Sequence, residues 1–209
     1  METRPVRPGL AAEIAALTGQ HLMLVLIALA AASAIALPAG IYIARHPRYR
    51  AAALAFTNIV QTVPSLALFG FLIPLPLIGG IGQRTAIIVL VMYALLPILR
   101  NTMTGILQVD AAVRESALAM GMTGRQLLRE VELPLAAPTI LAGLRIAAVT
   151  TIGTATIAAA IGAGGLGVFI FRGIATVDSA LLLAGAAPAA LLAITADGVL
   201  EWFERKLSR

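Results

Sequence analysis

Long apolar runs without any charge dominate the chain. Five segments contain no Asp, Glu, Lys or Arg, and they cover residues 14–44, 51–83, 85–99, 146–171 and 179–196. About 20 apolar residues suffice for a helix to cross the hydrocarbon core of a bilayer. Strands of a membrane barrel would instead alternate apolar and polar residues. The pattern therefore predicts an all-α integral membrane protein.

The apolar runs divide into five predicted membrane spans. The first is expected to break in its second half at Pro38, and the third to kink at Pro97. The first apolar run is longer than the roughly 7–15 residues of a cleaved signal peptide, so we expect it to remain as a span. The predicted spans cover about 21–44, 52–73, 85–106, 136–161 and 179–201.

Composition and charge agree with a membrane protein and suggest its orientation. Apolar residues make up 60% of the chain and charged residues 12%, about half the charged share of soluble domains. Lys and Arg accumulate on the cytoplasmic side of membrane proteins. With five spans, ten cationic residues fall on one side: Arg45, Arg48, Arg50, Arg100, Arg114, Arg125, Arg129, Arg205, Lys206 and Arg209. Four fall on the other: Arg4, Arg7, Arg84 and Arg172. This predicts a cytoplasmic C-terminus, an outside N-terminus and a plasma (inner) membrane location.

The charged segment 108–134 is predicted to form two short cytoplasmic helices. Asp110 can cap the first, which runs to Met120, and Gly121 suits the left-handed position after it. Thr123 and Gln126 fit a capping box that opens the second helix. Leu133-Pro134 is expected to stop that helix. Such a hairpin is either an ordinary solvated connection or a rigid docking surface.

In the hairpin, the tripeptide 115–117 is followed after three residues by Gly121, and after nine more by the stretch Val131 to Pro134. This pattern resembles the coupling motif of binding-protein-dependent ABC importer permeases. That motif reads Glu-Ala-Ala, three residues, Gly, nine residues and Ile-x-Leu-Pro. Both spacings are kept here, with Ser116 in place of Ala and Val131 in place of Ile. The matching positions are Glu115, Ser116, Ala117, Gly121, Val131, Leu133 and Pro134.

Three further stretches are similar to the same family: Gln61 to Ala67, Tyr93 to Thr102 and Ile161 to Gly167. With them the resemblance covers roughly residues 20–203, and they resemble the osmoprotectant branch, which handles glycine betaine, carnitine and choline. The last of the three stretches also resembles methionine-importer permeases, so a methionine-type or other amino-acid importer remains an alternative.

The resemblance implies a type I importer permease with several partners. Two permease subunits, identical or homologous, would form the pathway; two cytoplasmic ATPase subunits would bind ATP and Mg and receive the coupling helices; an extracytoplasmic binding protein would deliver the solute. The domains expected are an external segment 1–20, a transmembrane domain 21–203 with its coupling loop 108–134, and a cytoplasmic tail 204–209.

Polar residues inside the spans are candidates for the pathway or for helix contacts, and both interpretations stay open. The second span carries Thr57, Asn58, Gln61 and Thr62, in pairs four residues apart. The fourth carries Thr150, Thr151 and Thr154. A ridge of small residues at every fourth position, from Gly143 to Ala159, predicts close helix packing.

A glycine cluster and two charges complete the candidate sites. Gly162, Gly164, Gly165 and Gly167 satisfy the Gly-x-Gly-x-x-Gly fingerprint, but a membrane helix precedes them where a dinucleotide site needs a strand. We expect a flexible external turn or gate. Arg145 and Asp197, each costly alone in a membrane, are predicted to pair.

The remaining chemistry argues against an enzyme and against metal binding. The chain has no Cys, only one lysine, Lys206, and no phosphate-binding Gly-x-x-x-x-Gly-Lys-Ser/Thr loop, so ATP-derived energy must come from another chain. His21 and His46 are expected to be solvated or interfacial. The one Trp and three Tyr offer little for an aromatic cage around a quaternary ammonium group. A secondary carrier driven by an ion gradient is the alternative of another class, but it usually needs intramembrane acidic residues.

Overall fold

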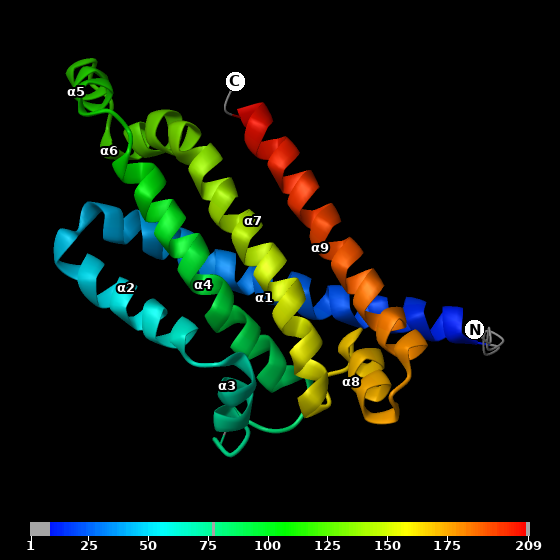
Figure 1. The fold of residues 1–209 in the computed structure, drawn as a ribbon. Helices are drawn as coiled ribbons and strands as arrows, with labels where there is room; N and C mark the ends of the chain where they lie inside the picture. The colour runs from blue at the N-terminus through cyan, green and yellow to red at the C-terminus, as the bar shows by residue number, and fades with distance from the viewer. Residues whose placement is uncertain (1–8, 77, 208–209) are drawn as a thin grey trace. The chain divides into compact units, whose positions relative to one another are not determined.

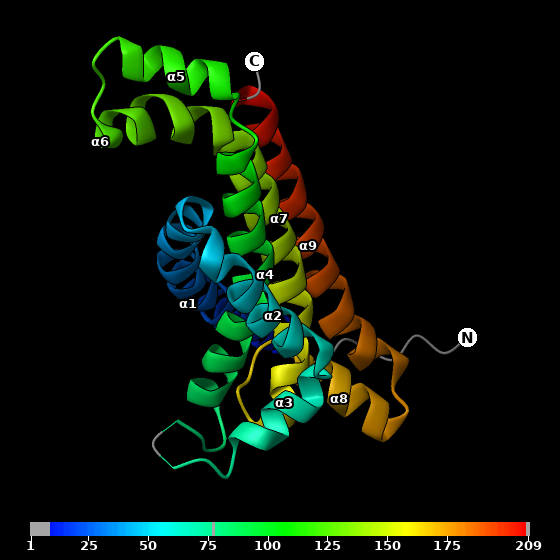
Figure 2. The same ribbon diagram turned by 90° about the vertical axis from the view of Figure 1, so that its left-hand side faces the viewer.

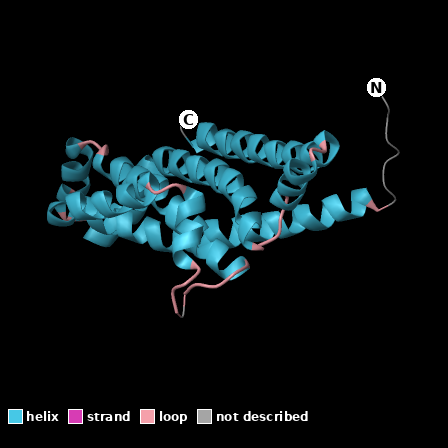
Figure 3. Ribbon diagram, turned by 60° about the horizontal axis from the view of Figure 1, so that its bottom comes forward, coloured by secondary structure: helices cyan, strands magenta, loops and turns pink. Residues whose placement is uncertain are grey.

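The computed structural model describes residues 9–76 and 78–207, and within these ranges the secondary structure is helical, without a strand (Figures 1 and 3). In chain order the elements are α1 (Leu10–Arg45), α2 (Pro47–Thr62), α3 (Ser65–Leu72), α4 (Gln83–Leu107), α5 (Ala111–Ala119), α6 (Gly124–Gln126), the π-helix η1 (Leu127–Glu132), α7 (Leu133–Ile157), the 3₁₀ helix η2 (Ala158–Ile161), α8 (Gly167–Thr176) and α9 (Ser179–Leu207).

Among the described residues, four helical stretches are long and apolar enough to cross a membrane. They are α1, α4, α9 and the continuous run Gly124–Ile161. A fifth crossing forms if α2 and α3, which meet at a bend of 98°, count as one broken span. The all-α membrane fold is thus confirmed, and the five predicted spans correspond to four continuous helical stretches and one bent pair.

The second predicted span, about 52–73, is wrong as a single helix. It breaks at Val63, whose backbone is extended with φ −72° and ψ 127°. Pro64 follows, and a proline disfavours helical geometry in the residue before it. The chain restarts as α3 at Ser65.

At Pro38 a break in the first span was predicted, and this prediction is wrong. The helix α1 continues through Pro38 from Leu10 to Arg45. A membrane helix tolerates proline because neighbouring groups can satisfy the freed backbone carbonyl.

α1 also begins earlier than predicted, so residues 10–20 are helical. Arg4, Arg7 and Arg209 lie outside the described residues.

The chain divides into two compact units. Unit 1 comprises Met1–Ala28, Pro64–Leu90 and Thr151–Ile194, and unit 2 comprises Leu29–Val63, Val91–Thr150 and Thr195–Arg209. The fully buried side chains of unit 1 include Leu24, Phe69, Leu90, Leu166 and Phe169. α8, which contributes Phe169, was not expected from the sequence.

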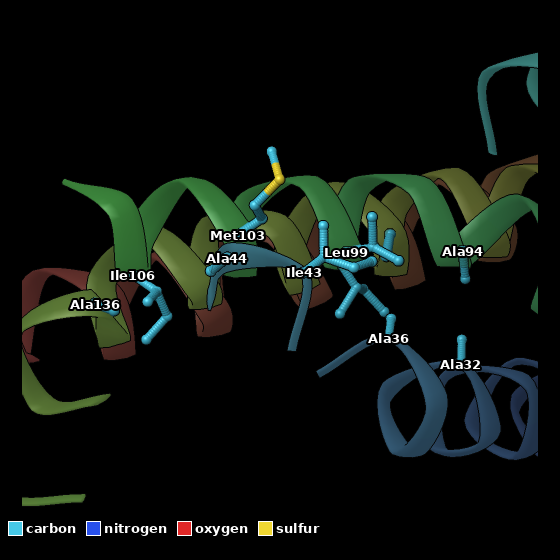
Figure 4. Close-up of a cluster of buried hydrophobic side chains, with 11 residues drawn as sticks. Ala32, Ala36, Ile43, Ala44, Ala94, Leu99, Met103, Ile106 and Ala136 are labelled. Atoms are coloured by element: carbon cyan, nitrogen blue, oxygen red, sulfur yellow. The ribbon is translucent and has the colours of Figure 1, made fainter. Parts of the chain in front are cut away.

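The core of unit 2 is built largely from small side chains. Figure 4 shows Ala94 of α4 pointing toward Ala32 of α1, with Leu99 near Ala36 further along the two helices. Gly143 of α7 lies so close to α4 that a Cβ there would come within 2.7 Å of the Pro97 carbonyl. The predicted small-residue ridge has Gly143 and Ala147 in unit 2 and its later members in unit 1. Gly143, Ala147, Thr151 and Ala155 are buried and Ala159 is half-buried, as expected of a packing surface.

Candidate functional site

A helical hairpin of α5, α6 and η1 extends past the ends of α4 and α7, and Figure 2 shows its two arms side by side. Asp110 Oδ1 accepts a hydrogen bond from the Ala112 amide at 2.9 Å, as predicted for the cap of the first arm. The arm ends within one residue of the expected position, at Ala119. Gly121 adopts the predicted left-handed conformation, with φ +86°.

The second arm opens with the predicted capping box. Thr123 Oγ1 accepts from the Gln126 amide, and Gln126 Oε1 accepts from the Thr123 amide at 2.8 Å. Both ends of the turn are therefore fixed by bonds between residues only a few positions apart.

The predicted helix stop at Leu133-Pro134 is wrong. Helix continues from Gly124 to Ile157 as α6, η1 and α7. Proline in an α-helix collides with the carbonyl four residues earlier. Here η1 precedes Pro134 with the wider π-helical turn, in which the Leu133 amide bonds to the Leu128 carbonyl five residues back. The widened turn accommodates the proline without a break.

The residues of the coupling-like motif occupy different environments on the hairpin. Glu115, Ser116 and Gly121 are exposed, whereas Ala117 is buried between the arms and its carbonyl accepts from the Met122 amide at 3.2 Å. The other motif positions follow in the second arm and the start of α7: Val131 and Leu133 are half-buried and Pro134 is exposed.

Larger exposed apolar side chains also lie on the first arm, close to its charged residues Arg114 and Glu115. Val113 and Leu118 are exposed, and Met120 beside the glycine is 74% exposed. An exposed apolar patch next to charged residues is typical of a protein-contact surface.

A buried carboxylate at the base of the hairpin was not found from the sequence. Glu132 Oε2 lies 2.6 Å from Arg45 Nη2, at the end of α1, and Glu132 Oε1 lies 3.2 Å from Arg114 Nε, on α5. The Glu132 side chain is only 5% exposed. Since Arg45 is 87 positions away, no local pattern indicates the contact.

Arg145 and Asp197 lie together, but not as an isolated pair. Arg145 Nε is 3.6 Å from Asp197 Oδ1, and its Nη1 is 3.9 Å from Glu201 and 3.6 Å from Glu204. The sequence suggested only the first of these carboxylates. Successive turns of α9 place all three acidic residues toward α7.

The polar residues of α2 do not share one environment. Thr57 is buried and its hydroxyl donates to the Ala53 carbonyl at 3.0 Å, whereas Asn58, Gln61 and Thr62 are exposed. Of the four, Thr57 therefore fits helix packing best, and the exposed three are the ones available to a pathway or a partner.

Two side-chain hydrogen bonds, one from Gln61 and one from Tyr93, connect α2 with α4. Gln61 Nε2 donates to the Tyr93 carbonyl at 3.0 Å, a carbonyl whose usual helical donor would be the amide that Pro97 lacks. The Tyr93 hydroxyl in turn donates to the Val63 carbonyl, next to the break at Pro64. A side chain of α2 thus binds the α4 carbonyl that Pro97 leaves without a donor. A side chain of α4 binds the carbonyl that precedes Pro64.

The threonines of α7 also separate by burial. Thr150 is exposed and donates to the Ile146 carbonyl at 2.8 Å. Thr151 is fully buried, and Thr154 is half-buried. Thr151 therefore belongs to the packing ridge.

The glycine cluster 162–167 is mostly buried. Gly162, Gly164 and Gly165 have φ of +75°, +84° and +77°, which favours glycine at each. Gly167 packs against the Thr156 carbonyl with no room for a Cβ. The helices η2 and α8 flank the cluster, so it lacks the preceding strand of a dinucleotide site.

Two residues of α1 hold this cluster. Gln20 Oε1 accepts from the Gly165 amide at 3.3 Å. His21 is completely buried, with Nε2 3.1 Å from the Ile152 carbonyl and Nδ1 facing the position of a Gly165 Cβ. The expected solvated or interfacial role of His21 is therefore wrong. His46, in contrast, stacks on Tyr42 with ring centroids 4.1 Å apart.

The family model described as binding-protein-dependent transport system inner membrane component matches residues 36–209. The chain is also similar to curated permeases. It is 47% identical over 190 residues to the glycine betaine/carnitine/choline transport system permease protein OpuCD of Bacillus subtilis, covering 90% of this chain and 82% of the relative. It is 50% identical to the carnitine transport permease protein OpuCD of Listeria monocytogenes, covering 85% and 78%. It is 45% identical to the osmoprotectant import permease protein OsmW of Salmonella typhimurium, covering 93% and 89%.

Solved structures show the same fold. An inward-facing form of the MetNI methionine ABC transporter matches with a TM-score of 0.85 and 24% identity, covering 98% of this chain and all of the other. An amino acid ABC transporter matches with a TM-score of 0.72 and 20% identity, covering 94% of each chain. Together with the hairpin geometry, these matches show that the chain belongs to the family of binding-protein-dependent transport system inner membrane components and is a permease subunit.

Proposed function

We propose that this permease imports a compatible solute with a quaternary ammonium group, such as glycine betaine, carnitine or choline. The observation that carries the substrate class is the 44–50% identity to relatives whose names specify these solutes. Methionine or another amino acid is the weaker candidate, because the structures of those transporters share only 20–25% identity with this chain.

Energy for import comes from a separate pair of ATPase subunits, which bind ATP and Mg. The chain itself contains no phosphate-binding loop with its Lys. The hairpin α5–η1 is the surface that these subunits contact. Its exposed motif residues Glu115 and Gly121, and the exposed Met120 between them, support this assignment.

The assembly contains a second permease subunit and an extracytoplasmic binding protein. High-affinity recognition belongs to the binding protein, because aromatic side chains suited to a quaternary ammonium group are scarce in this chain. Asn58, Gln61, Thr62 and Thr150 are exposed polar residues of α2 and α7, which supports a role in lining a weakly binding pathway. The Gly162 to Gly167 turn would serve as the external gate.

The chain crosses the inner membrane with its hairpin and C-terminus in the cytoplasm and its N-terminus outside. The bias of cationic residues supports this orientation. Since the sequence has no Cys, the single-cysteine variants Arg125→Cys and Arg84→Cys can be labelled with a membrane-impermeant maleimide without background. Both positions are exposed, and they lie on opposite predicted sides of the membrane. Labelling of position 125 in intact cells would contradict the orientation.

Reconstitution tests the function directly. Liposomes containing the permease, its ATPase and its binding protein should take up labelled glycine betaine, carnitine or choline only with ATP, and omission of any one component should abolish uptake. Uptake by the permease alone under an ion gradient would instead establish a secondary carrier. A titration of the binding protein with each solute and with methionine identifies the cargo.

A matched pair of variants tests the hairpin contact. Asn and Asp both tolerate the left-handed backbone that Gly121 adopts, and they have nearly the same size. A Cβ at this position meets no other atom within 4 Å, so both variants should fold. Gly121→Asp should weaken ATPase attachment more than Gly121→Asn, because it adds a desolvated charge to the contact.

A further inference from the structure

Glu132 joins three segments of unit 2 through one buried carboxylate. Each of its two oxygens forms an ion pair with a different guanidinium, Arg45 at the end of α1 and Arg114 on α5. Arg114 also donates to the Ile106 carbonyl at the end of α4. The two hairpin arms and the end of α1 therefore meet at this side chain, and Arg114 extends the connection to α4.

The arrangement resists independent movement of its parts. A carboxylate that is 5% exposed needs compensation by its partners, because an unpaired buried charge is strongly unfavourable. Since Oε2 faces Arg45 and Oε1 faces Arg114, rotation toward one partner would abandon the other. A displacement of η1 is consequently passed to α1.

The end of α1 is itself stiffened where Arg45 receives this contact. Arg50, at the start of α2, donates to the carbonyls of Ile43 and Ala44. Arg45 is thus the last residue of a helix whose terminal carbonyls are already bound. A displacement of its guanidinium therefore acts on an ordered helix end and not on a frayed terminus.

We infer that Glu132 is a positioning residue that makes the end of α1 move with the hairpin, so that the stroke of the ATPase reaches α1 as well as α7. This inference rests on the proposed function. Glu132 occupies the one position of the Val131-to-Pro134 stretch for which the coupling motif specifies no residue type, and the ion pairs give that position a role.

The test variant is Glu132→Gln in the complete transporter, with Glu130→Gln as its control. Glu130 lies on the same π-helix and is exposed, so the control removes an equal charge outside the ion-pair group. Three quantities are measured in liposomes: ATPase bound per permease, ATP hydrolysed, and solute taken up per ATP. Glu132→Gln should bind ATPase normally and hydrolyse ATP, while uptake per ATP falls at least about tenfold. Glu130→Gln should retain the wild-type ratio.

The results separate the two levels of the argument. If the wild-type assembly shows no ATP-dependent uptake, the proposed function fails. If the wild type transports and Glu132→Gln keeps its uptake per ATP, the inference about Glu132 is overturned. The inference is also overturned if uptake falls only in proportion to the amount of folded, ATPase-bound transporter. That result would mean that Glu132 stabilises the fold without coupling the movement of α1 to the hairpin.

A second variant covers the case in which Glu132→Gln does not fold. Arg45→Gln leaves the Arg114 pair with the carboxylate in place, and Arg45→Lys keeps the charge. Arg45→Gln should lower uptake per ATP, and Arg45→Lys should restore part of it. In a double-mutant cycle, Arg45→Gln should add little to Glu132→Gln, since both remove the same link. Wild-type coupling in Arg45→Gln would contradict the inference.

Discussion

The hairpin turn around Gly121 and the glycine cluster 162–167 use similar backbone geometry in very different surroundings. Gly121 and Gly165 have φ of +86° and +77°. Bonds between near neighbours hold the hairpin turn, such as that from Met122 to Ala117, and Gly121 is exposed. Gly165 is buried and held by Gln20, 145 positions away. Similar glycine patterns can therefore mark either a self-contained turn or a packed junction.

The largest expected difference involves Gly167, where a Cβ would collide with the Thr156 backbone carbonyl. Gly167→Ala should lower the free energy of unfolding by at least about 2 kcal/mol, since overpacking against backbone cannot be relieved by a rotamer change. Thermal unfolding in detergent measures the loss. Gly198→Ala is the control, because its Cβ would meet no atom within 4 Å and alanine favours helix. A stable Gly167→Ala variant would show that the glycine cluster is not a packed junction.

The direct comparison is Gly165→Ala against Gly121→Ala. Both place alanine in the left-handed region, at a cost of about 1 kcal/mol. Only at Gly165 does the new Cβ also press on His21, 3.1 Å from Nδ1, so its total loss should reach about 2 kcal/mol. Unfolding midpoints of the two variants under identical conditions provide the measurement. Equal losses would remove the distinction between the two turns.

Local capping at the hairpin turn should have a local effect. Thr123→Ala removes the side-chain acceptor of the capping box, worth about 1 kcal/mol to the helix it opens. Amide hydrogen exchange should accelerate at residues 124–126 while the global unfolding midpoint changes little. Thr123→Ser, which keeps the hydroxyl, should exchange like the wild type. A drop in global stability matching that of Gly167→Ala would contradict this.

The smallest effect is expected at Gln20. Its bond to the Gly165 amide is long, at 3.3 Å, and Gln20→Ala should cost about 0.5 kcal/mol. Gln20→Glu keeps an acceptor oxygen and serves as the control. Unlike Thr123→Ala, the change should accelerate exchange at a distant site, the amide of Gly165. Acceleration confined to residues near Gln20 would disprove the long-range link.

The contrast between contacts of near neighbours and contacts of distant residues also explains which features the sequence could predict. The helical spans followed from charge-free runs, and the caps at Asp110, Gly121 and Thr123 were predicted because their partners lie within a few residues. The ion pairs of Glu132 could not be predicted, because Arg45 comes from a distant helix end.

Proline was the poorest guide to where a helix ends. The helix α1 continues through Pro38, α7 continues through Pro134 after a π-helix, and the helix breaks at Pro64 between α2 and α3. The outcome depends on whether the helix has room to widen and on which groups nearby can accept or donate hydrogen bonds. At Pro64 the Tyr93 hydroxyl satisfies the carbonyl of Val63, and this partner lies 30 positions along the chain.

The hydrogen bonds that Gln61 and Tyr93 donate between α2 and α4 have a consequence for biogenesis. A backbone carbonyl left bare in hydrocarbon costs several kcal/mol. Until α4 has emerged from the ribosome, the carbonyl of Val63 has no Tyr93 hydroxyl, and until α2 is in place the carbonyl of Tyr93 has no Gln61 amide. Each segment alone would enter the bilayer with an unpaired backbone carbonyl. We therefore expect α2 and α4 to leave the insertion machinery together.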